Sequence, residues 1–270
     1  MLLSEAKSIK QSINILQVTD SHLFESQDGK LLGLNTDQSL QRVIEQVDAS
    51  LVDLVFATGD ISQDGSLKSY QRFNELVSDI QRPTYWLEGN HDQFAAFQKD
   101  LGDVGRMSPC ALSRGNWGFI LLNSSVDDAV PGYLADSELA FLDAKLEEFK
   151  EQHVLIALHH QVIETGCEWL DQQMVGNADQ FFDRIDRYAN VRGVVWGHVH
   201  QEMDQERNGV RLMSSPSTCV QFKPNSKEFS VDTLAPGYRW IKCHEDGQLE
   251  TEVCRVEGVE FEVDYSVKGY

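Results

Sequence analysis

Five short polar segments, each at the end of an apolar run, constrain this chain more than any other feature of its sequence. The runs are short and apolar, which is typical of buried strands. The side chains that follow them are Asp, Asn and His, which are common metal ligands. The segments are Asp20-Ser21-His22, Gly59-Asp60, Gly89-Asn90-His91-Asp92, His159-His160 and Gly197-His198-Val199-His200. Five such segments in this order predict one site that holds two metal ions.

The apolar runs alternate with helical patterns along most of the chain. We expect strands at residues 13–18, 51–57, 84–87, 117–122, 154–158, 191–196, 210–213, 238–243 and 251–256. The spacing of apolar residues predicts helices at 40–47, 70–80, 136–150 and 178–188, with Asp136 as an N-cap. This order predicts an α/β protein with partly mixed sheets. Ligands of open α/β sheets gather at the carboxyl ends of strands, where all five polar segments are expected.

Composition limits the classes of partner. The chain has 270 residues and a formal net charge of −20 at pH 7. That charge disfavours nucleic-acid polymers and anionic membranes, but two divalent cations would still attract a small anionic substrate. No apolar run approaches the ~20 residues that span a bilayer. Residues 1–11 lack the apolar core of a signal peptide, so we expect a cytoplasmic protein.

Domain organisation and cysteine usage give two further expectations. No repeat, low-complexity tract or Pro/Gly-rich linker divides the sequence, so we interpret residues 1–270 as a single domain. The five cysteines are scattered and form no Cys-x-x-Cys motif. We therefore expect reduced, mostly buried thiols rather than disulfides or a zinc–thiolate site. The oligomeric state is left open.

Each polar segment has an ordinary alternative when it is taken alone, such as a turn or a surface histidine. Asp20 and His22 lie two residues apart, a spacing that lets two ligands converge just past a strand. His198 and His200 have the same spacing. The carboxylate of Asp60 can bridge two cations. As a set, these nitrogen and oxygen ligands favour Fe, Mn, Co or Zn over Ca or Mg.

Two segments carry residues whose roles differ. Asn90 offers a neutral oxygen, which suits a site already rich in carboxylates, and the adjacent His91 can then point at substrate. Of the pair His159-His160, we favour His159 as a ligand because it comes first after the strand. His160 then has a structural or supporting role.

Two further predictions concern the surroundings of the site. Asp64, Asp92 and backbone groups are candidates to orient the imidazoles. Trp169 and Phe222 either shape a nucleotide pocket or pack in the core, and the sequence does not separate these alternatives.

The ordered set of segments resembles the calcineurin-like metallophosphoesterase superfamily. Its pattern Asp-x-His, Gly-Asp, Gly-Asn-His-Asp/Glu, His, Gly-His-x-His runs from Asp20 to His200, although Gln161-Val162-Ile163 stand where a proline is common. The resemblance implies two packed mixed β-sheets flanked by helices, a four-layer αββα sandwich. It also implies a dinuclear metal centre. One metal would be bound by Asp20, His22 and His200, the other by Asn90, His159 and His198, with Asp60 bridging.

Further stretches are similar to the bacterial class III 3′,5′-cyclic-AMP phosphodiesterases. They are residues 15–24, 31–33, 57–60, 166–172, 232–237 and, most distinctively, 215–224. This resemblance implies hydrolysis of 3′,5′-cyclic AMP to 5′-AMP by a metal-bound hydroxide, which lowers intracellular cyclic AMP. It implies that His91 is catalytic and that the substrate contacts His22, Asp60, Asn90, His91 and His200.

The cofactors expected from this resemblance are two divalent ions, Fe²⁺ and/or Mn²⁺, with Zn²⁺ or Co²⁺ as alternatives. The alternative activity is a broader phosphodiesterase or phosphomonoesterase with the same metals. A non-catalytic scaffold on the same fold is the alternative from a different class.

Overall fold

Two six-stranded mixed sheets form the centre of the computed structural model, which describes residues 12–97, 100–101 and 106–269. In spatial order, the first sheet contains β16 (Leu249–Arg255), β15 (Gly237–Cys243), β1 (Ile13–Val18), β4 (Leu54–Thr58), β5 (Thr84–Leu87) and β6 (Arg106–Met107). The second contains β11 (Met203–Arg207), β12 (Val210–Ser214), β10 (Val191–Trp196), β9 (His153–Ala157), β8 (Trp117–Leu121) and β7 (Cys110–Arg114). Residues 1–11, on which the signal-peptide expectation rests, lie outside the described part.

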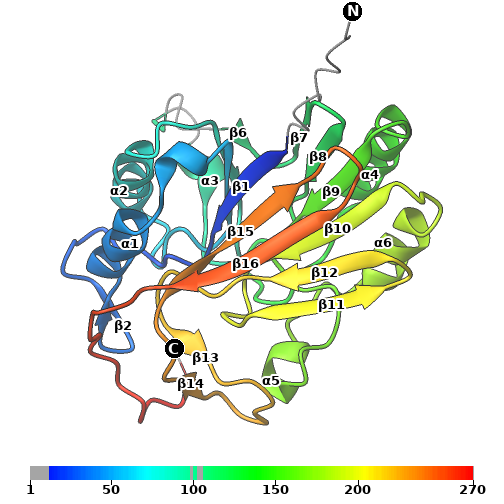
Figure 1. The fold of residues 1–270 in the computed structure, drawn as a ribbon. Helices are drawn as coiled ribbons and strands as arrows, with labels where there is room; N and C mark the ends of the chain where they lie inside the picture. The colour runs from blue at the N-terminus through cyan, green and yellow to red at the C-terminus, as the bar shows by residue number, and fades with distance from the viewer. Residues whose placement is uncertain (1–11, 98–99, 102–105, 270) are drawn as a thin grey trace, which may run out of the picture.

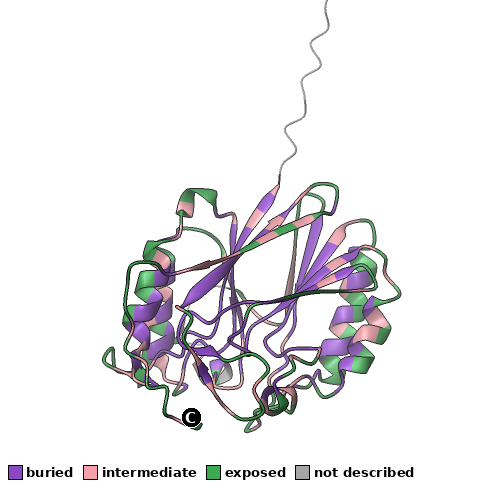
Figure 2. Ribbon diagram, turned by 60° about the horizontal axis from the view of Figure 1, so that its bottom comes forward, coloured by how far each residue is buried: buried purple, intermediate pink, exposed green. Residues whose placement is uncertain are grey.

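Helices cover the outer faces of both sheets, as Figures 1 and 2 show. The helices are α1 (Thr36–Glu45), α2 (Leu67–Ser78), α3 (Phe94–Phe97), α4 (Asp136–Glu148), α5 (Glu168–Asp171) and α6 (Ala178–Ile185). Side chains alternate along the strands: Ile15 packs between the two sheets, whereas Leu16 packs under α1 and α2. On the second sheet, α4 and α6 cover a separate apolar cluster. The predicted αββα sandwich is therefore confirmed.

Parallel pairing brings strand ends to one edge of each sheet. β1 pairs parallel with β4, and β4 with β5. In the second sheet, β10 pairs parallel with both β9 and β12. The carboxyl ends of these parallel neighbours therefore meet, and each of the five polar segments begins one or two residues beyond its strand.

Two local predictions were wrong. The strand predicted to start at residue 51 begins at Leu54, because Ala49–Leu51 form a 3₁₀ helix that the Asp48 side chain caps by accepting from Ser50 N. Asp136 is the first helical residue of α4 rather than its N-cap, which is Ala135. In that position its carboxylate still interacts favourably with the helix dipole.

Several short elements were not predicted. They include two small hairpins, β2 (Lys30–Leu31) with β3 (Leu34–Asn35) and β13 (Gln221–Phe222) with β14 (Val231–Asp232), besides β6, β7, β11, α3 and α5. Most of these elements are too short to show a periodic pattern of apolar residues. β11 is longer, but it is a largely exposed strand at the edge of its sheet, so its sequence lacks a clear alternation of apolar and polar residues. In the part of the chain that the structure describes, no helix is long and apolar enough to cross a membrane.

Candidate metal centre

The loops after five strands of the two sheets, β1, β4, β5, β9 and β10, meet at one place. In the first sheet, Asp20 N donates to Gly59 O (3.0 Å) and His22 N donates to Asp60 O (2.9 Å). The second sheet joins them through His198 N, which donates to both carboxylate oxygens of Asp20 at 3.0 Å. The structure therefore brings the five segments into one buried cluster.

Five residues of this cluster have backbone conformations that L-amino acids rarely adopt. Their φ angles are 53° for Asp20, 47° for His22, 47° for Asp60, 63° for His198 and 47° for His200. A left-handed φ in a residue other than glycine is uncommon, and it persists only where the surrounding structure enforces it. The αL turns aim alternate side chains into the same space, so this strain coincides with the predicted metal ligands.

Three glycines make the close approach of these loops sterically feasible. A Cβ on Gly59 would overlap the His159 ring, and one on Gly89 would overlap Asp60. A Cβ on Gly197 would overlap the Thr19 hydroxyl. The glycine that begins three of the segments is therefore required by packing as well as by turn geometry.

Asp20, His22 and His200 form one half of the cluster. His22 Nδ1 lies 2.7 Å from Gln63 Oε1, and His200 Nδ1 lies 2.8 Å from Val220 O. Both acceptors are carbonyl oxygens, so each Nδ1 carries the proton and each Nε2 presents a lone pair. The two Nε2 atoms face one another at 3.1 Å, and Asp20 Oδ1 lies 3.5 Å from His200 Nε2. Acceptors that converge in this way could hold a cation between them.

Asn90, His159 and His198 form the other half. His159 Nδ1 donates to Thr58 O at 2.8 Å, so its Nε2 lone pair faces Asn90 Oδ1 at 3.3 Å. The His198 side chain is buried, and its Nε2 has no hydrogen-bond partner among the described residues. Buried polar atoms are almost always paired, so this nitrogen points to a ligand such as a metal ion.

Asp60 lies between the two halves. Its Oδ2 is 3.8 Å from His22 Nε2 and 3.4 Å from His159 Nε2. Its other oxygen, Oδ1, accepts from His91 N at 2.9 Å. A carboxylate that reaches both halves fits two cations that share one bridging ligand.

The geometry separates the adjacent histidines 159 and 160. His160 Nε2 donates to Val130 O at 3.0 Å, and its Nδ1 accepts from the Ser124 hydroxyl at 2.8 Å. One ring nitrogen of His160 lies within 4.8 Å of ring nitrogens of His159 and His198, so proximity alone does not distinguish it. The hydrogen bonds do, because both nitrogens of His160 are already engaged with protein groups.

The ionisation of the buried groups matches a cation site. Burial, together with neighbouring imidazoles, lowers the pKa of His22 to about 3 and that of His198 well below its usual range. Burial opposes ionisation of Asp60, but the charges of His159 and His91 hold its pKa well below the ordinary value. Burial also lowers the pKa of His159, but the carboxylates of Asp60 and Asp20 outweigh it and raise that pKa to about 9. His22 and His198 therefore stay neutral and keep lone pairs for a cation, whereas the carboxylates of Asp60 and Asp20 attract positive charge to the site.

The groups that orient the imidazoles were only partly predicted. Backbone carbonyls of Thr58 and Val220 do so, as expected, but the side chain of Gln63 was missed. Asp92 accepts instead from the backbone N–H groups of Ile61, Ser62 and Gly89, and Asp64 accepts from Glu25 N and Ser66 N. These carboxylates hold loops rather than rings. The feature of the sequence that could have identified Gln63 is its position three residues after Asp60, close to the site.

A cavity of about 500 Å³ opens beside Asn90 and His91. The loop after β8, including Asp127 and Val130, lines its other side. The ring of His91 lies edge-on to that of His22, with centroids 5.1 Å apart. A ligand in this cavity therefore has access to His91 and to the cluster behind it.

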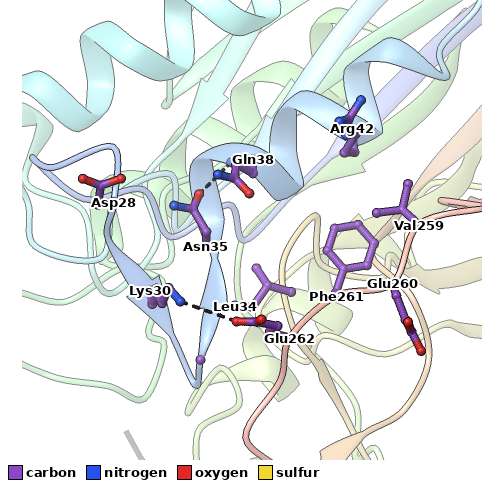
Figure 3. Close-up of a pocket in the computed structure, with 11 residues that line it drawn as sticks. Asp28, Lys30, Leu34, Asn35, Gln38, Arg42, Val259, Glu260, Phe261 and Glu262 are labelled. Atoms are coloured by element: carbon purple, nitrogen blue, oxygen red, sulfur yellow. Dashed lines mark hydrogen bonds and ion pairs between the residues drawn. The ribbon is translucent and has the colours of Figure 1, made fainter.

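Two further features surround the cluster. Trp169 and Phe222 pack together with their ring centroids 5.1 Å apart; Phe222 is buried in the core, whereas Trp169 is partly buried. A cavity of about 410 Å³ lies between α1, the β2–β3 hairpin and the C-terminal tail (Figure 3). Its lining includes an exposed ion pair, Lys30 with Glu262 at 3.7 Å, and none of the residues of the cluster.

Comparison with known proteins identifies the family to which this chain belongs. The chain is 42% identical over 269 residues to the 3′,5′-cyclic adenosine monophosphate phosphodiesterase CpdA of Pseudomonas aeruginosa, covering 99% of this chain and 98% of that protein. It is 41% identical to the CpdA protein of Escherichia coli (strain K12), covering 96% and 95% of the two chains. Among solved structures, a dimetal phosphatase from Danio rerio superposes with a TM-score of 0.64 at 14% identity, covering 91% of this chain and 99% of that one.

The sequence profile described as calcineurin-like phosphoesterase matches residues 13–202, the stretch that carries all five polar segments. Together with the buried His and Asp clusters, this match indicates a dinuclear centre for divalent metals. The chain belongs to the calcineurin-like phosphoesterase family.

Proposed function

We propose that this protein hydrolyses 3′,5′-cyclic AMP to 5′-AMP and so lowers intracellular cyclic AMP, with the whole chain acting as one metallophosphoesterase domain. The observation that carries the proposal is the pair of ligand groups on either side of Asp60, all buried except the half-buried Asn90. The 41–42% identity, over nearly the full length, to bacterial proteins named as cyclic AMP phosphodiesterases supports the choice of substrate.

The metal ligands follow from the two halves of the cluster. Asp20, His22 and His200 hold one divalent ion, and Asn90, His159 and His198 hold the other, with Asp60 bridging. The donor set contains nitrogen and oxygen atoms without thiolates, which favours Fe²⁺ and/or Mn²⁺, with Zn²⁺ or Co²⁺ as alternatives. The converging lone pairs and the unpartnered His198 Nε2 support this assignment.

Bound divalent ions supply charge neutralisation and lower the pKa of water. The remaining work belongs to side chains of this protein. His22, Asp60, Asn90 and His200 surround the position of the phosphate. Water would add to phosphorus and release one proton while the bond from phosphorus to the 3′-oxygen breaks. His91 would give the leaving 3′-oxygen a proton, and the proton released by the water would restore His91. Proton donation of this kind contributes on the order of 10²–10⁴-fold to the rate.

The cavity beside Asn90 and His91 is the proposed place of the nucleoside. Carboxylates of Glu88, Asp127 and Asp128 line it, so it disfavours further phosphate groups. This lining and the net charge of −20 support a small cyclic nucleotide rather than a nucleic-acid polymer as substrate. All five cysteines are free thiols, which supports a reducing, cytoplasmic location.

A substrate panel tests the proposal. The enzyme is loaded with Mn²⁺ or Fe²⁺, and kcat/KM is measured on cyclic AMP, cyclic GMP, 2′,3′-cyclic AMP and p-nitrophenyl phosphate esters. We expect the highest value for cyclic AMP. If cyclic AMP is the poorest substrate, the broader phosphodiesterase or phosphomonoesterase replaces our proposal. Fewer than one bound ion per chain, with no hydrolysis of any ester, indicates a scaffold instead.

A further inference from the structure

We propose that residues 215–222 form a positioning element for one half of the metal centre, the half made by Asp20, His22 and His200, and that Phe222 is its positioning residue. This inference rests on the proposed metal ligands. It gives a physical role to the most distinctive stretch of the sequence, which the proposed chemistry does not use. We call these residues the 215–222 segment.

The segment fixes the ring of His200 on two sides. The Phe222 ring is stacked on it, with centroids 4.1 Å apart and planes inclined by 6°. Val220 O accepts the Nδ1 proton of His200 at 2.8 Å, and Phe222 N donates to His200 O at 3.3 Å. The hydrogen bond selects the tautomer, and the stack selects the plane of the ring. Together they aim Nε2 at His22 and Asp20.

The same segment holds the strained backbone of Asp20. The Ser217 hydroxyl donates to Asp20 O at 2.7 Å, and Thr218 N donates to Thr19 O at 3.0 Å. Because Asp20 has a φ of 53°, its backbone needs such contacts to stay in the αL conformation. The segment therefore touches two of the three ligands in this half.

The segment is itself firmly anchored. Phe222 is 1% exposed, and its ring also contacts Trp169 and Phe229, with centroids 5.1 and 5.4 Å away. Thr218 O accepts from the Ser39 hydroxyl of α1 at 2.7 Å. A buried, braced aromatic ring can hold an imidazole plane in a way that a mobile side chain cannot.

The imidazoles of the other half are oriented by different contacts. His159 is oriented by Thr58 O at the end of β4. His198 is linked to the first half through its backbone N–H, which donates to the Asp20 carboxylate. The contacts of the 215–222 segment described above fall on Asp20 and His200. A substitution in the segment should therefore lower the affinity for one metal ion and leave the affinity for the other largely unchanged.

The test compares Phe222→Leu with Phe229→Leu as a matched control. Phe229 belongs to the same aromatic cluster, and its ring packs edge-on against Trp169 and Phe222. Metal-free enzyme is titrated with Mn²⁺, and bound ions are counted by mass spectrometry. In Phe222→Leu we expect one ion to bind as in the wild type and the other about 10–100-fold more weakly. Phe229→Leu should bind both ions as the wild type does.

A milder variant guards against misfolding. Ser217→Ala removes the hydroxyl that supports Asp20 and should lower the affinity for the same ion by a smaller factor. Circular dichroism of the metal-free variants checks that they fold. The inference fails if Phe222→Leu binds both ions with wild-type affinity, or if its affinity for both ions falls by the same factor. If Phe222→Leu does not fold, the same two outcomes in Ser217→Ala decide. Two ions bound by a wild-type enzyme that leaves cyclic AMP intact would overturn the proposed function instead.

Discussion

At the scale of single residues, strained conformations mark the chemistry. Asp20, His22, Asp60, His198 and His200 all have left-handed φ angles. Each such residue costs roughly 1–2 kcal/mol relative to the right-handed conformation. The strained residues lie where side chains converge on the proposed metal centre, and neighbouring hydrogen bonds hold the strained turns in place.

His91 should separate chemistry from metal binding. Its backbone N–H contacts Asp60, while its side chain lines the cavity proposed for the substrate. We expect His91→Ala to retain both ions and lose about 10²–10⁴-fold in kcat. His153→Ala is the matched control, because His153 begins β9, whose opposite end leads to His159. Wild-type turnover in His91→Ala would contradict the proposed role.

The pair His159 and His160 should respond in opposite ways. His159→Ala removes a nitrogen that faces Asp60 and Asn90, so the content of bound metal should fall from two ions toward one. His160→Ala should keep both ions but lower the free energy of unfolding by about 1–3 kcal/mol, because Ser124 and Val130 lose a buried partner. Metal analysis and urea unfolding measure the two effects. The reverse pattern would make His160 the ligand.

At the scale of elements, the end of each strand sets the position of its ligand. β1, β4, β5, β9 and β10 each end in a tight turn, and three of these turns begin the segment with glycine. The glycine brings the next residues back against a neighbouring loop, as Gly197 does against Thr19. The end of the strand sets the position of the proposed metal-binding residue at the edge of the sheet, and the turn sets the direction of its side chain.

Gly89→Ala tests this arrangement at the end of β5. The added methyl group would overlap the backbone N and the Oδ1 of Asp60, so the two loops must separate. We expect fewer than two bound ions per chain and a loss of about 1–3 kcal/mol in unfolding free energy. Gly176→Ala is the control, because a Cβ there meets its nearest atom at 3.6 Å, an ordinary contact. Equal metal content in both variants would count against the packing argument.

At the scale of the whole molecule, buried polar groups tie the two sheets together beneath the metal centre. Gln17 of β1 donates to Thr58 Oγ1 at 2.8 Å and to Trp196 O, across the sheets, at 3.1 Å. Arg239 of β15 donates to Ser214 O of β12 at 2.6 Å through Nη2. These links hold strand ends from different sheets at a fixed separation, which a two-metal site needs.

Removal of the metals should destabilise the whole protein. Without cations, buried lone pairs of His22 and His200 face each other, and the nearby carboxylates lose a partner. At 100 times its dissociation constant, each ion bound only by the folded state contributes about 2.7 kcal/mol. We expect a chelator to lower the melting temperature and added Mn²⁺ to restore it, as measured by differential scanning fluorimetry. A melting temperature that does not change when the chelator is added would contradict the proposed metal centre.

The sequence by itself determined the strand ends and the chemical types of the site residues, because apolar runs, turn glycines and ligand spacing are local features. β1 and β10 have the predicted bounds, and the five segments follow strands as expected. The tertiary structure decided what depends on distant partners. His159 and His160 are neighbours in sequence, and only the facing loops separate them, with Thr58 against one and Ser124 against the other. Phe222 lies 22 residues from His200, and only the folded chain stacks the two rings.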